Sequence, residues 1–318
     1  MPGLSTIWSA GVFDPYSSSS NLTMHRSLLL PTGPALRRDI LADSGMSTEA
    51  FDAEFRVLRN DRYLSRSTTM TAPEWVVSIA KHSLGEPVVG GMAAQIMHGS
   101  VWYDDDFTIE LIRDPTASGR PARGTITHRI ELSESEVVEI AGILVTSVIK
   151  TAFDIGREGP PWRALGRLDA LQRATGFDPA ELAAYAKRKK GSRGIRQLRR
   201  LIPLIDGTAE SPPESWVRLL MHDGGLPTPE LQVKVYNTYG VAFARIDLAY
   251  EEHRIGIEYD GEYHNSPEQR IADAAREQTL VAELDWIMIH VDKDRMRDKP
   301  IGVLTEIRRA LHTRGVYF

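Results

Sequence analysis

The sequence predicts a multidomain protein of the α+β and α/β classes, and three observations support that prediction. A chain of 318 residues is too long for one ordinary hydrophobic core, so two or three domains are expected. With 42% hydrophobic and 25% charged residues, the composition is that of a globular protein and excludes collagen, coiled coil and wholesale disorder. Segments with helical periodicity alternate with segments in which apolar and polar residues take turns, the pattern of half-buried strands.

The composition also excludes several kinds of site and location. The chain has no cysteine, which rules out disulfides, thiolate zinc sites, iron–sulfur clusters and cysteine nucleophiles. It has no apolar run long enough to span a membrane, and residues 1–16 lack the features of a signal peptide. We therefore expect a cytoplasmic protein with no membrane partner. The net charge of −5 offers no overall basic field for nucleic acid, although the charge is unevenly distributed.

Four regions are expected along the chain. Residues 1–28, which contain a run of serines, are expected to be a flexible leader. Residues 29–70 form a small first domain and residues 71–207 a mixed α/β middle region. An α/β domain at 208–318 begins at a proline pair, where a helix capped by Ser211 is expected to start.

The first domain has the outline of a winged helix-turn-helix. Residues 36–41 and 47–58 are predicted helices, residues 43–46 the turn between them, and residues 62–67 a strand. Docking of this unit on DNA is one interpretation, and a small helical subdomain without that role is the other. The acids of the second helix weigh against DNA because they would face phosphates; they are Glu49, Asp52 and Glu54.

The middle region contains no catalytic constellation. Predicted helices cover 75–82, 91–98 and 148–156, and predicted strands cover 107–113 and 124–131. The histidines here are far apart in sequence and are interpreted as core or surface residues; they are His82, His98 and His128.

Residues 156–203 differ in charge from the rest of the chain. They contain twelve Lys and Arg residues against four acids. A solvated helical face is the ordinary explanation of such a run, but this concentration of positive charge favours contact with phosphates. The side chains predicted to bind nucleic acid here are Lys187, Arg188, Lys189, Lys190, Arg193, Arg196 and Arg200.

Three strands with a clean two-residue alternation follow the boundary helix. They cover residues 231–236, 244–250 and 255–259. The connection at 251–253 is short enough to make the second and third strands an antiparallel hairpin.

This hairpin is predicted to bring three acids together. A turn centred near Glu252 places position 247 opposite about 257, so Asp247 is expected beside Glu258, with Asp260 further along the same face. Three converging carboxylates would raise one another's pKa values and cost stability unless a cation resolved the repulsion. Hard oxygen ligands of this kind suit Mg²⁺ or Mn²⁺, which hold substrate phosphates and activate water.

Two further side chains can complete the site. Glu214, on the preceding helix, can add a carboxylate, and His264 can act as a general base, orient water or bind phosphate. The arrangement D-x10-E-x-D-G-x2-H is more specific than a loose pair of acids. The alternative leaves the strand acids exposed and paired with Arg245 or Arg254.

The downstream segments complete an α/β sandwich. A helix predicted over 266–284 places Asp273 and Arg276 on adjacent turns. The apolar run at 286–291 suits a central strand covered on both faces, and a last helix is predicted over 300–312.

Four motifs of this domain are distinctive: Ser211-Pro-Pro-Glu214-Ser-Trp-Val-Arg218, Arg245-Ile-Asp247-Leu-Ala-Tyr, Ile257-Glu258-Tyr-Asp260-Gly261…His264 and Asp273-Ala-Ala-Arg276. Together they closely resemble a bacterial domain related to very-short-patch repair endonucleases, within the restriction-endonuclease-like PD-(D/E)XK superfamily. Across residues 30–318 the layout is similar to actinobacterial AbiEi-like proteins, which join this domain to an N-terminal winged helix and are named after antitoxins of abortive-infection systems.

The resemblance implies a restriction-endonuclease-like αβββαβα sandwich at 208–318 and assigns roles within it. Asp247 matches the central metal-binding aspartate, Glu258 the acid of the E-x-K motif, and Glu214 the acid of the first helix. The lysine of that motif is Asp260 here. The repair-endonuclease branch also lacks this lysine and relies on histidine, a role that falls to His264.

Three functional hypotheses follow, and the first two share nucleic acid, above all DNA, as the partner. The first is a nuclease in which the acids hold Mg²⁺ or Mn²⁺ while Arg245 or Arg276 steadies the phosphate. The second is a non-catalytic AbiEi-like antitoxin or transcriptional regulator, which binds DNA through the winged helix and the basic segment. The third is a scaffold that pairs with a partner toxin.

Overall fold

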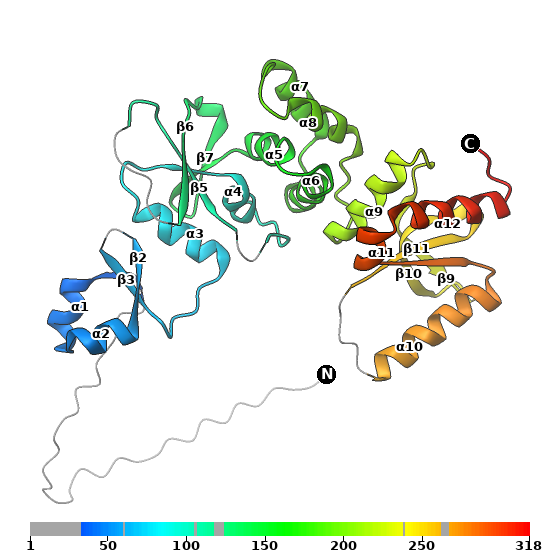
Figure 1. The fold of residues 1–318 in the computed structure, drawn as a ribbon, viewed down its shortest axis with the longest axis horizontal. Coiled ribbons are helices and arrows are strands. Elements are labelled where there is room, and N and C mark those ends of the chain that lie inside the picture. Colours follow the sequence, from blue (N-terminus) through cyan, green and yellow to red (C-terminus); the bar gives the residue numbers. More distant parts are fainter. Residues whose placement is uncertain (1–32, 60, 105–106, 118–123, 238, 262–266) are drawn as a thin grey trace, which may run out of the picture.

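The structure, a computed structural model, describes residues 33–59, 61–104, 107–117, 124–237, 239–261 and 267–318 (Figure 1). It has a mixed α/β architecture, in which the described residues form three sheets with helices packed against them. The predicted leader and the predicted site residue His264 lie outside the described residues. None of the helices within these ranges is long and apolar enough to cross a membrane.

The first unit is a three-stranded sheet with two short helices around a small aromatic core. Gly45 ends the first helix with a φ of 64°, a conformation that glycine adopts freely, and the Ser47 hydroxyl caps the second. Phe51 and Phe55 stack in the core with ring centroids 5.0 Å apart. The elements are β1 (Ala35–Leu36), α1 (Arg37–Ser44), α2 (Thr48–Glu54), β2 (Phe55–Arg59) and β3 (Arg62–Ser65).

The prediction of a helix over 47–58 is wrong beyond residue 54. Residues 55–59 form β2, which pairs antiparallel with β3. Aromatic and β-branched residues such as Phe55 and Val57 favour a strand once a partner strand is present. That partner is supplied by the tertiary fold, and the local helical pattern contains no sign of it.

The middle region contains a five-stranded sheet in the order β6-β5-β4-β8-β7. The helix α3 begins with a capping box between Thr71 and Glu74, and it packs with α4 on a core that includes Val89, Leu111 and Val145. The elements are α3 (Ala72–Lys81), β4 (Val88–Gly90), α4 (Gly91–Met97), β5 (Ile109–Arg113), β6 (Thr125–Arg129), η1 (Glu134–Glu136), β7 (Val137–Ile140) and β8 (Ile143–Thr146).

The basic segment folds as a helical unit that follows the middle sheet. Its helices bury leucines such as Leu168, Leu182 and Leu198 in one core, while the Lys and Arg side chains between residues 187 and 200 are exposed. The elements are α5 (Val148–Gly156), α6 (Pro161–Thr175), α7 (Pro179–Arg188), α8 (Ile195–Leu201) and η2 (Ile202–Leu204).

The C-terminal unit is a four-stranded sheet between two layers of helix. The sheet order is β12-β11-β10-β9, with β11 and β12 parallel and the other pairs antiparallel. Helices α9 and α12 pack on one face, and α10 lies across the other (Figure 1). The elements are α9 (Pro212–Asp223), β9 (Glu230–Tyr236), β10 (Ala242–Tyr250), η3 (Glu251–His253), β11 (Ile255–Asp260), α10 (Pro267–Gln278), η4 (Thr279–Glu283), β12 (Ile287–Asp292), α11 (Lys293–Asp298) and α12 (Pro300–Thr313).

The predicted register of the hairpin is wrong by one residue. Leu248 pairs with Ile257, which places Asp247 across from Glu258 instead of position 257. Directly opposed residues of an antiparallel pair share a face, and a slip of one residue moves a side chain to the other face. The observed register therefore puts these two carboxylates on the same face of the sheet.

The prediction of a central last strand is also wrong, because β12 lies at the edge of the sheet beside β11. Its apolar side chains Ile289 and Val291 are buried against Val303 and Ile307 of α12. The apolar run thus reflects packing under a helix, which the sequence pattern alone does not distinguish from a central position.

Candidate active site

A cleft of about 500 Å³ opens on the polar face of the C-terminal sheet, beside α10. Strands β10 and β11 supply its floor, and α10 supplies one wall. Both the strands and α10 contribute acidic and basic side chains to the cleft. The lining residues are Arg245, Asp247, Glu258, Tyr259, Asp260, Gly261, Asp273 and Arg276.

Asp247 is held at the centre of this cleft by its neighbours in the sheet. Its Oδ2 accepts a hydrogen bond of 3.1 Å from the backbone N–H of Tyr259, and its Oδ1 lies 3.4 Å from the amide nitrogen of Gln232. Burial raises the pKa of Asp247, and the Tyr259 hydrogen bond offsets part of that rise. The carboxylate is therefore oriented and partly desolvated before any ligand arrives.

Glu258 lies beside Asp247, and one of its oxygens has no hydrogen-bond partner among the described residues. Nη2 of Arg276 lies 3.3 Å from its Oε2, and only 13% of the Glu258 side chain is exposed. Its Oε1 is buried and has no hydrogen-bond partner in the described part of the chain. Burial raises the pKa of Glu258, Arg276 lowers it, and the charge of Asp247 raises it further.

Asp260 points to a histidine that the sequence did not single out. Nδ1 of His290 lies 3.1 Å from an oxygen of Asp260, and Nε2 lies 3.2 Å from Glu277 on α10. Burial alone would lower the pKa of His290, but the two carboxylates outweigh it and raise that pKa. The indication in the sequence was that His290 is a polar residue within the apolar run at 286–291.

Gln232 is a second residue that the sequence did not single out. It lies on β9 across from β10, and its backbone has a φ of 54°, which is uncommon for a residue with a side chain. Its amide nitrogen donates 2.8 Å to Glu214 as well as approaching Asp247. The only indication of its role in the sequence was that Gln232 is a polar residue on the side of the strand that faces away from the apolar residues.

Glu214 lies behind the cleft lining, linked to Asp247 through Gln232. The side chain is buried, and both of its oxygens already accept hydrogen bonds. Oε1 accepts from the Ser211 hydroxyl at 2.8 Å, and Oε2 accepts from the backbone N–H of Glu210 at 2.9 Å. Ser211 is the N-cap residue of α9 as predicted, but its hydroxyl donates to the Glu214 carboxylate and forms no capping hydrogen bond with the described backbone of the helix.

Arg245 borders the cleft and is held by an acid outside it. Its two terminal nitrogens lie 3.0 and 2.6 Å from the two oxygens of Glu210, which also pairs with Arg173 of α6. Arg254 donates instead to the backbone oxygen of Leu284. The interpretation in which the strand acids pair with Arg245 or Arg254 is therefore wrong.

The basic residues of the helical unit lie apart from the cleft lining. Lys189 pairs with Glu136 at 2.7 Å, Arg200 pairs with Asp223 at 3.0 Å, and Arg188 lies over the ring of Tyr185. The others are exposed and form no ion pair with any described residue; they are Lys187, Lys190, Arg193 and Arg196.

The lining residues fit a small divalent cation. Within the described residues, no three His, Asp or Glu side chains gather closely enough to hold a metal by themselves. Mg²⁺, however, commonly uses one or two carboxylates and completes its octahedron with water and substrate phosphates. Asp247 and Glu258 provide such a pair. The buried Oε1 of Glu258, which no described residue hydrogen-bonds, has the chemistry of a cation ligand.

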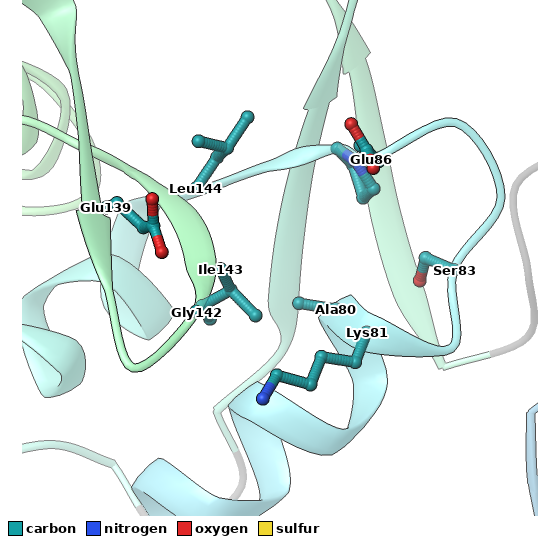
Figure 2. A pocket seen from close by; sticks show the side chains of 9 residues that line it. Ala80, Lys81, Ser83, Glu86, Glu139, Gly142, Ile143 and Leu144 are labelled. Atoms are coloured by element: carbon teal, nitrogen blue, oxygen red, sulfur yellow. The ribbon is translucent and has the colours of Figure 1, made fainter.

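Another cleft, of about 350 Å³, lies between the end of α3 and the β7–β8 hairpin (Figure 2). Lys81, Glu86 and Glu139 border it, together with the hydrocarbon side chains of Ile143 and Leu144. All of its charged side chains are exposed, whereas the Glu258 side chain is partly buried. Packing therefore does not fix the position of these charged groups as it fixes that of Glu258.

Two proteins of Mycobacterium tuberculosis are similar to this chain. They are "Uncharacterized protein MT2308" of strain CDC 1551 / Oshkosh and "Uncharacterized protein Rv2248" of strain ATCC 25618 / H37Rv. Each is 33% identical over 211 residues, which is 66% of this chain and 76% of the relative. No family model matches the chain. At this identity and coverage, the chain belongs to the same family as these two mycobacterial proteins.

Proposed function

We propose that the protein is a metal-dependent endonuclease that hydrolyses phosphodiester bonds of nucleic acid, DNA above all. One observation carries this proposal: two neighbouring, partly desolvated carboxylates line one open cleft together with two arginines, and one of the carboxylates has a buried oxygen with no hydrogen-bond partner among the described residues. Acids suit a cation and arginines suit phosphate, so the cleft combines the two chemistries that phosphodiester hydrolysis needs.

We further propose a specific fold for the C-terminal unit and for the first unit. The order of helix, three antiparallel strands, helix and parallel strand from α9 to β12 supports a restriction-endonuclease-like domain. The two helices and the small sheet of residues 35–65 support a winged-helix-like unit.

In this proposal, Asp247 and Glu258 hold Mg²⁺ or Mn²⁺, which would neutralise phosphate charge and lower the pKa of a coordinated water. Arg245 and Arg276 neutralise the phosphate oxygens. Asp260 replaces the lysine of the related nucleases and can accept a proton or hydrogen bond from the attacking water. His264, which lies outside the described residues, would orient or deprotonate the attacking water.

The proposal is tested by a cleavage assay with the full chain. Supercoiled plasmid, single-stranded DNA and RNA are incubated with Mg²⁺, Mn²⁺ or EDTA. We expect cleavage that EDTA abolishes, and we expect Asp247→Asn to reduce its rate at least about 100-fold, since even the loss of a supporting residue near a metal costs 10- to 100-fold. Asp43→Asn, an exposed aspartate of the first unit, is the matched control.

Cleavage that survives Asp247→Asn would contradict the proposal. No cleavage by the wild-type chain, together with salt-sensitive DNA binding that the variant retains, would favour the second candidate function. That candidate is a DNA-binding antitoxin or regulator with an inert nuclease fold. The exposed basic side chains in and between α7 and α8 that form no ion pair with a described residue support it; they are Lys187, Lys190, Arg193 and Arg196.

A further inference from the structure

The contact between Arg276 and Glu258 is too long for a strong ion pair. Nη2 of Arg276 lies 3.3 Å from Oε2 of Glu258 and 3.8 Å from an oxygen of Asp273, one turn earlier on α10. Strong hydrogen bonds between guanidinium and carboxylate measure about 2.7 to 2.9 Å. The arginine is therefore near two acids but tightly bound to neither.

Both partners of this contact also retain unused polar atoms. Nε of Arg276 and Oε1 of Glu258 are buried, and each lacks a hydrogen-bond partner in the part of the chain that the structure describes. An unpaired buried polar atom destabilises the fold, so each atom would gain from a ligand. The guanidinium nitrogen can only donate, and the carboxylate oxygen accepts from a donor or binds a cation.

The two side chains therefore suit two ligands of opposite charge in one cleft. Arg276 suits an anion such as a phosphate oxygen, and Glu258 with Asp247 suits a divalent cation. Glu258 cannot serve both Arg276 and a divalent cation equally well, because the two positive groups would repel at close range.

We propose that Arg276 exchanges between two partners, Glu258 and a phosphate oxygen of the nucleic acid. While the cleft holds no divalent cation, the guanidinium neutralises the partly buried Glu258 carboxylate. When Glu258 and Asp247 hold the cation, Arg276 turns to the phosphate. This inference rests on the proposed function, and it makes the cation and the nucleic acid bind cooperatively, since each one releases a side chain that the other needs.

The first test measures Mn²⁺ binding to the full chain without nucleic acid, by electron paramagnetic resonance. Arg276→Gln removes the competitor for Glu258, so we expect Mn²⁺ to bind roughly 10-fold more tightly, within the 5- to 150-fold range of typical couplings. Arg276→Lys retains the charge and is expected to stay near the wild type. Arg245→Gln removes the same charge from the same cleft without freeing Glu258, so it reports any general electrostatic effect.

The second test adds a short phosphorothioate-substituted DNA duplex, which is cleaved slowly. We expect the duplex to tighten Mn²⁺ binding to the wild type and to leave Arg276→Gln unchanged. If Arg276→Gln and Arg245→Gln change the Mn²⁺ affinity equally, or if neither changes it, the exchange is overturned while the nuclease proposal stays intact. Mn²⁺ binding that is absent, or indifferent to Asp247→Asn, would overturn both.

Discussion

At the scale of single residues, the charges of Asp247 and Glu258 are unfavourable for stability but are needed for the proposed function. The fold partly buries both carboxylates side by side, and this burial raises the pKa of each. A neutral side chain would fit this environment better than a charged one. Sites that bind ligands commonly retain such unfavourable groups because the ligand needs them.

We therefore expect Asp247→Asn to stabilise the fold while it removes the activity. Because burial raises the pKa of Asp247 above its ordinary 3.8, its ionised form destabilises the protein at neutral pH and its protonated form does not. The variant should melt a few degrees higher than the wild type at pH 7, and the difference should shrink as the pH falls toward 3.8. Thermal unfolding followed by circular dichroism measures this. Asp43→Asn should show no such difference, and a lower melting temperature for Asp247→Asn at pH 7 would contradict the expectation.

At the scale of elements, α9 joins the helical unit to the C-terminal sheet. Leu219 packs into the core of α5 to α8, while Val217 and Met221 pack against the sheet. A buried ion pair fixes the junction, since Nη2 of Arg218 lies 2.5 Å from Asp169 of α6. The arginine also donates to the backbone oxygen of Leu204. The units that carry the cleft and the basic surface are therefore packed together through one helix.

Breaking this buried pair should destabilise the protein far more than breaking an exposed one. Asp169→Asn leaves the Arg218 charge buried without a countercharge, which typically costs about 3 to 5 kcal/mol. Asp223→Asn removes the partner of Arg200, an exposed pair that also joins the helical unit to α9, and should cost below about 1 kcal/mol. Urea denaturation of both variants measures the difference. Equal losses would show that the buried pair does not hold the junction.

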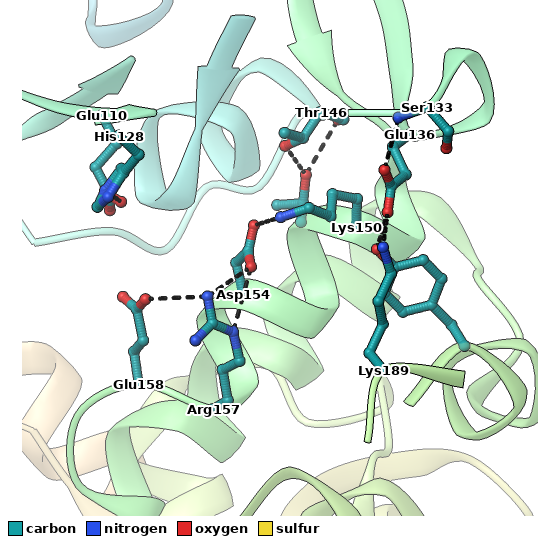
Figure 3. Close-up of polar contacts among 12 residues, drawn as sticks. Glu110, His128, Ser133, Glu136, Thr146, Lys150, Asp154, Arg157, Glu158 and Lys189 are labelled. Carbon is teal, nitrogen blue, oxygen red and sulfur yellow. Dashed lines mark hydrogen bonds and ion pairs between the residues drawn. The ribbon is translucent and has the colours of Figure 1, made fainter. Parts of the chain in front are cut away.

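At the scale of the whole molecule, an acidic protein presents a local basic surface. The middle sheet holds part of it in place, because Glu136 accepts from Tyr185 and Ser133 and pairs with Lys189 (Figure 3). Burial opposes ionisation of Glu136, but these contacts outweigh it and lower its pKa to about 2. Lys189 therefore stabilises the fold through this ion pair, whereas the exposed side chains of Lys187 and Arg193 can contact a ligand.

Charge reversal on this surface should weaken nucleic-acid binding in a salt-dependent way. We expect the combined variant Lys187→Glu, Arg193→Glu, Arg196→Glu to weaken binding of duplex DNA in EDTA, and to reduce the slope of log affinity against log salt by about 1 per lost phosphate contact. Fluorescence anisotropy over a salt series measures both quantities. Arg309→Glu, on the exposed side of α12, is the control for a change in net charge. Unchanged affinity and slope would show that α7 and α8 do not contact nucleic acid.

Several elements were predictable because their causes are local. The helix α5 has the bounds that its pattern predicts, and the alternation of 244–250 and 255–259 identifies β10 and β11. The pairing of Asp247 with Glu258 was expected in outline because a short connection forces a hairpin. The hairpin register was not, because the turn geometry at 251–253 shifts it by one residue.

The sequence by itself determined the mixed α/β class, the polar face that gathers the acids, and the place of the basic segment, since alternation, helical periodicity and charge are properties of neighbouring residues. Only the tertiary structure decided which of these side chains pair with one another and which can bind a ligand. His290 joins Asp260, and Arg276 joins Glu258, through contacts between elements that are distant in sequence. Burial and partnership arise from packing, so a carboxylate's unpaired oxygen is visible only after the chain has folded around it.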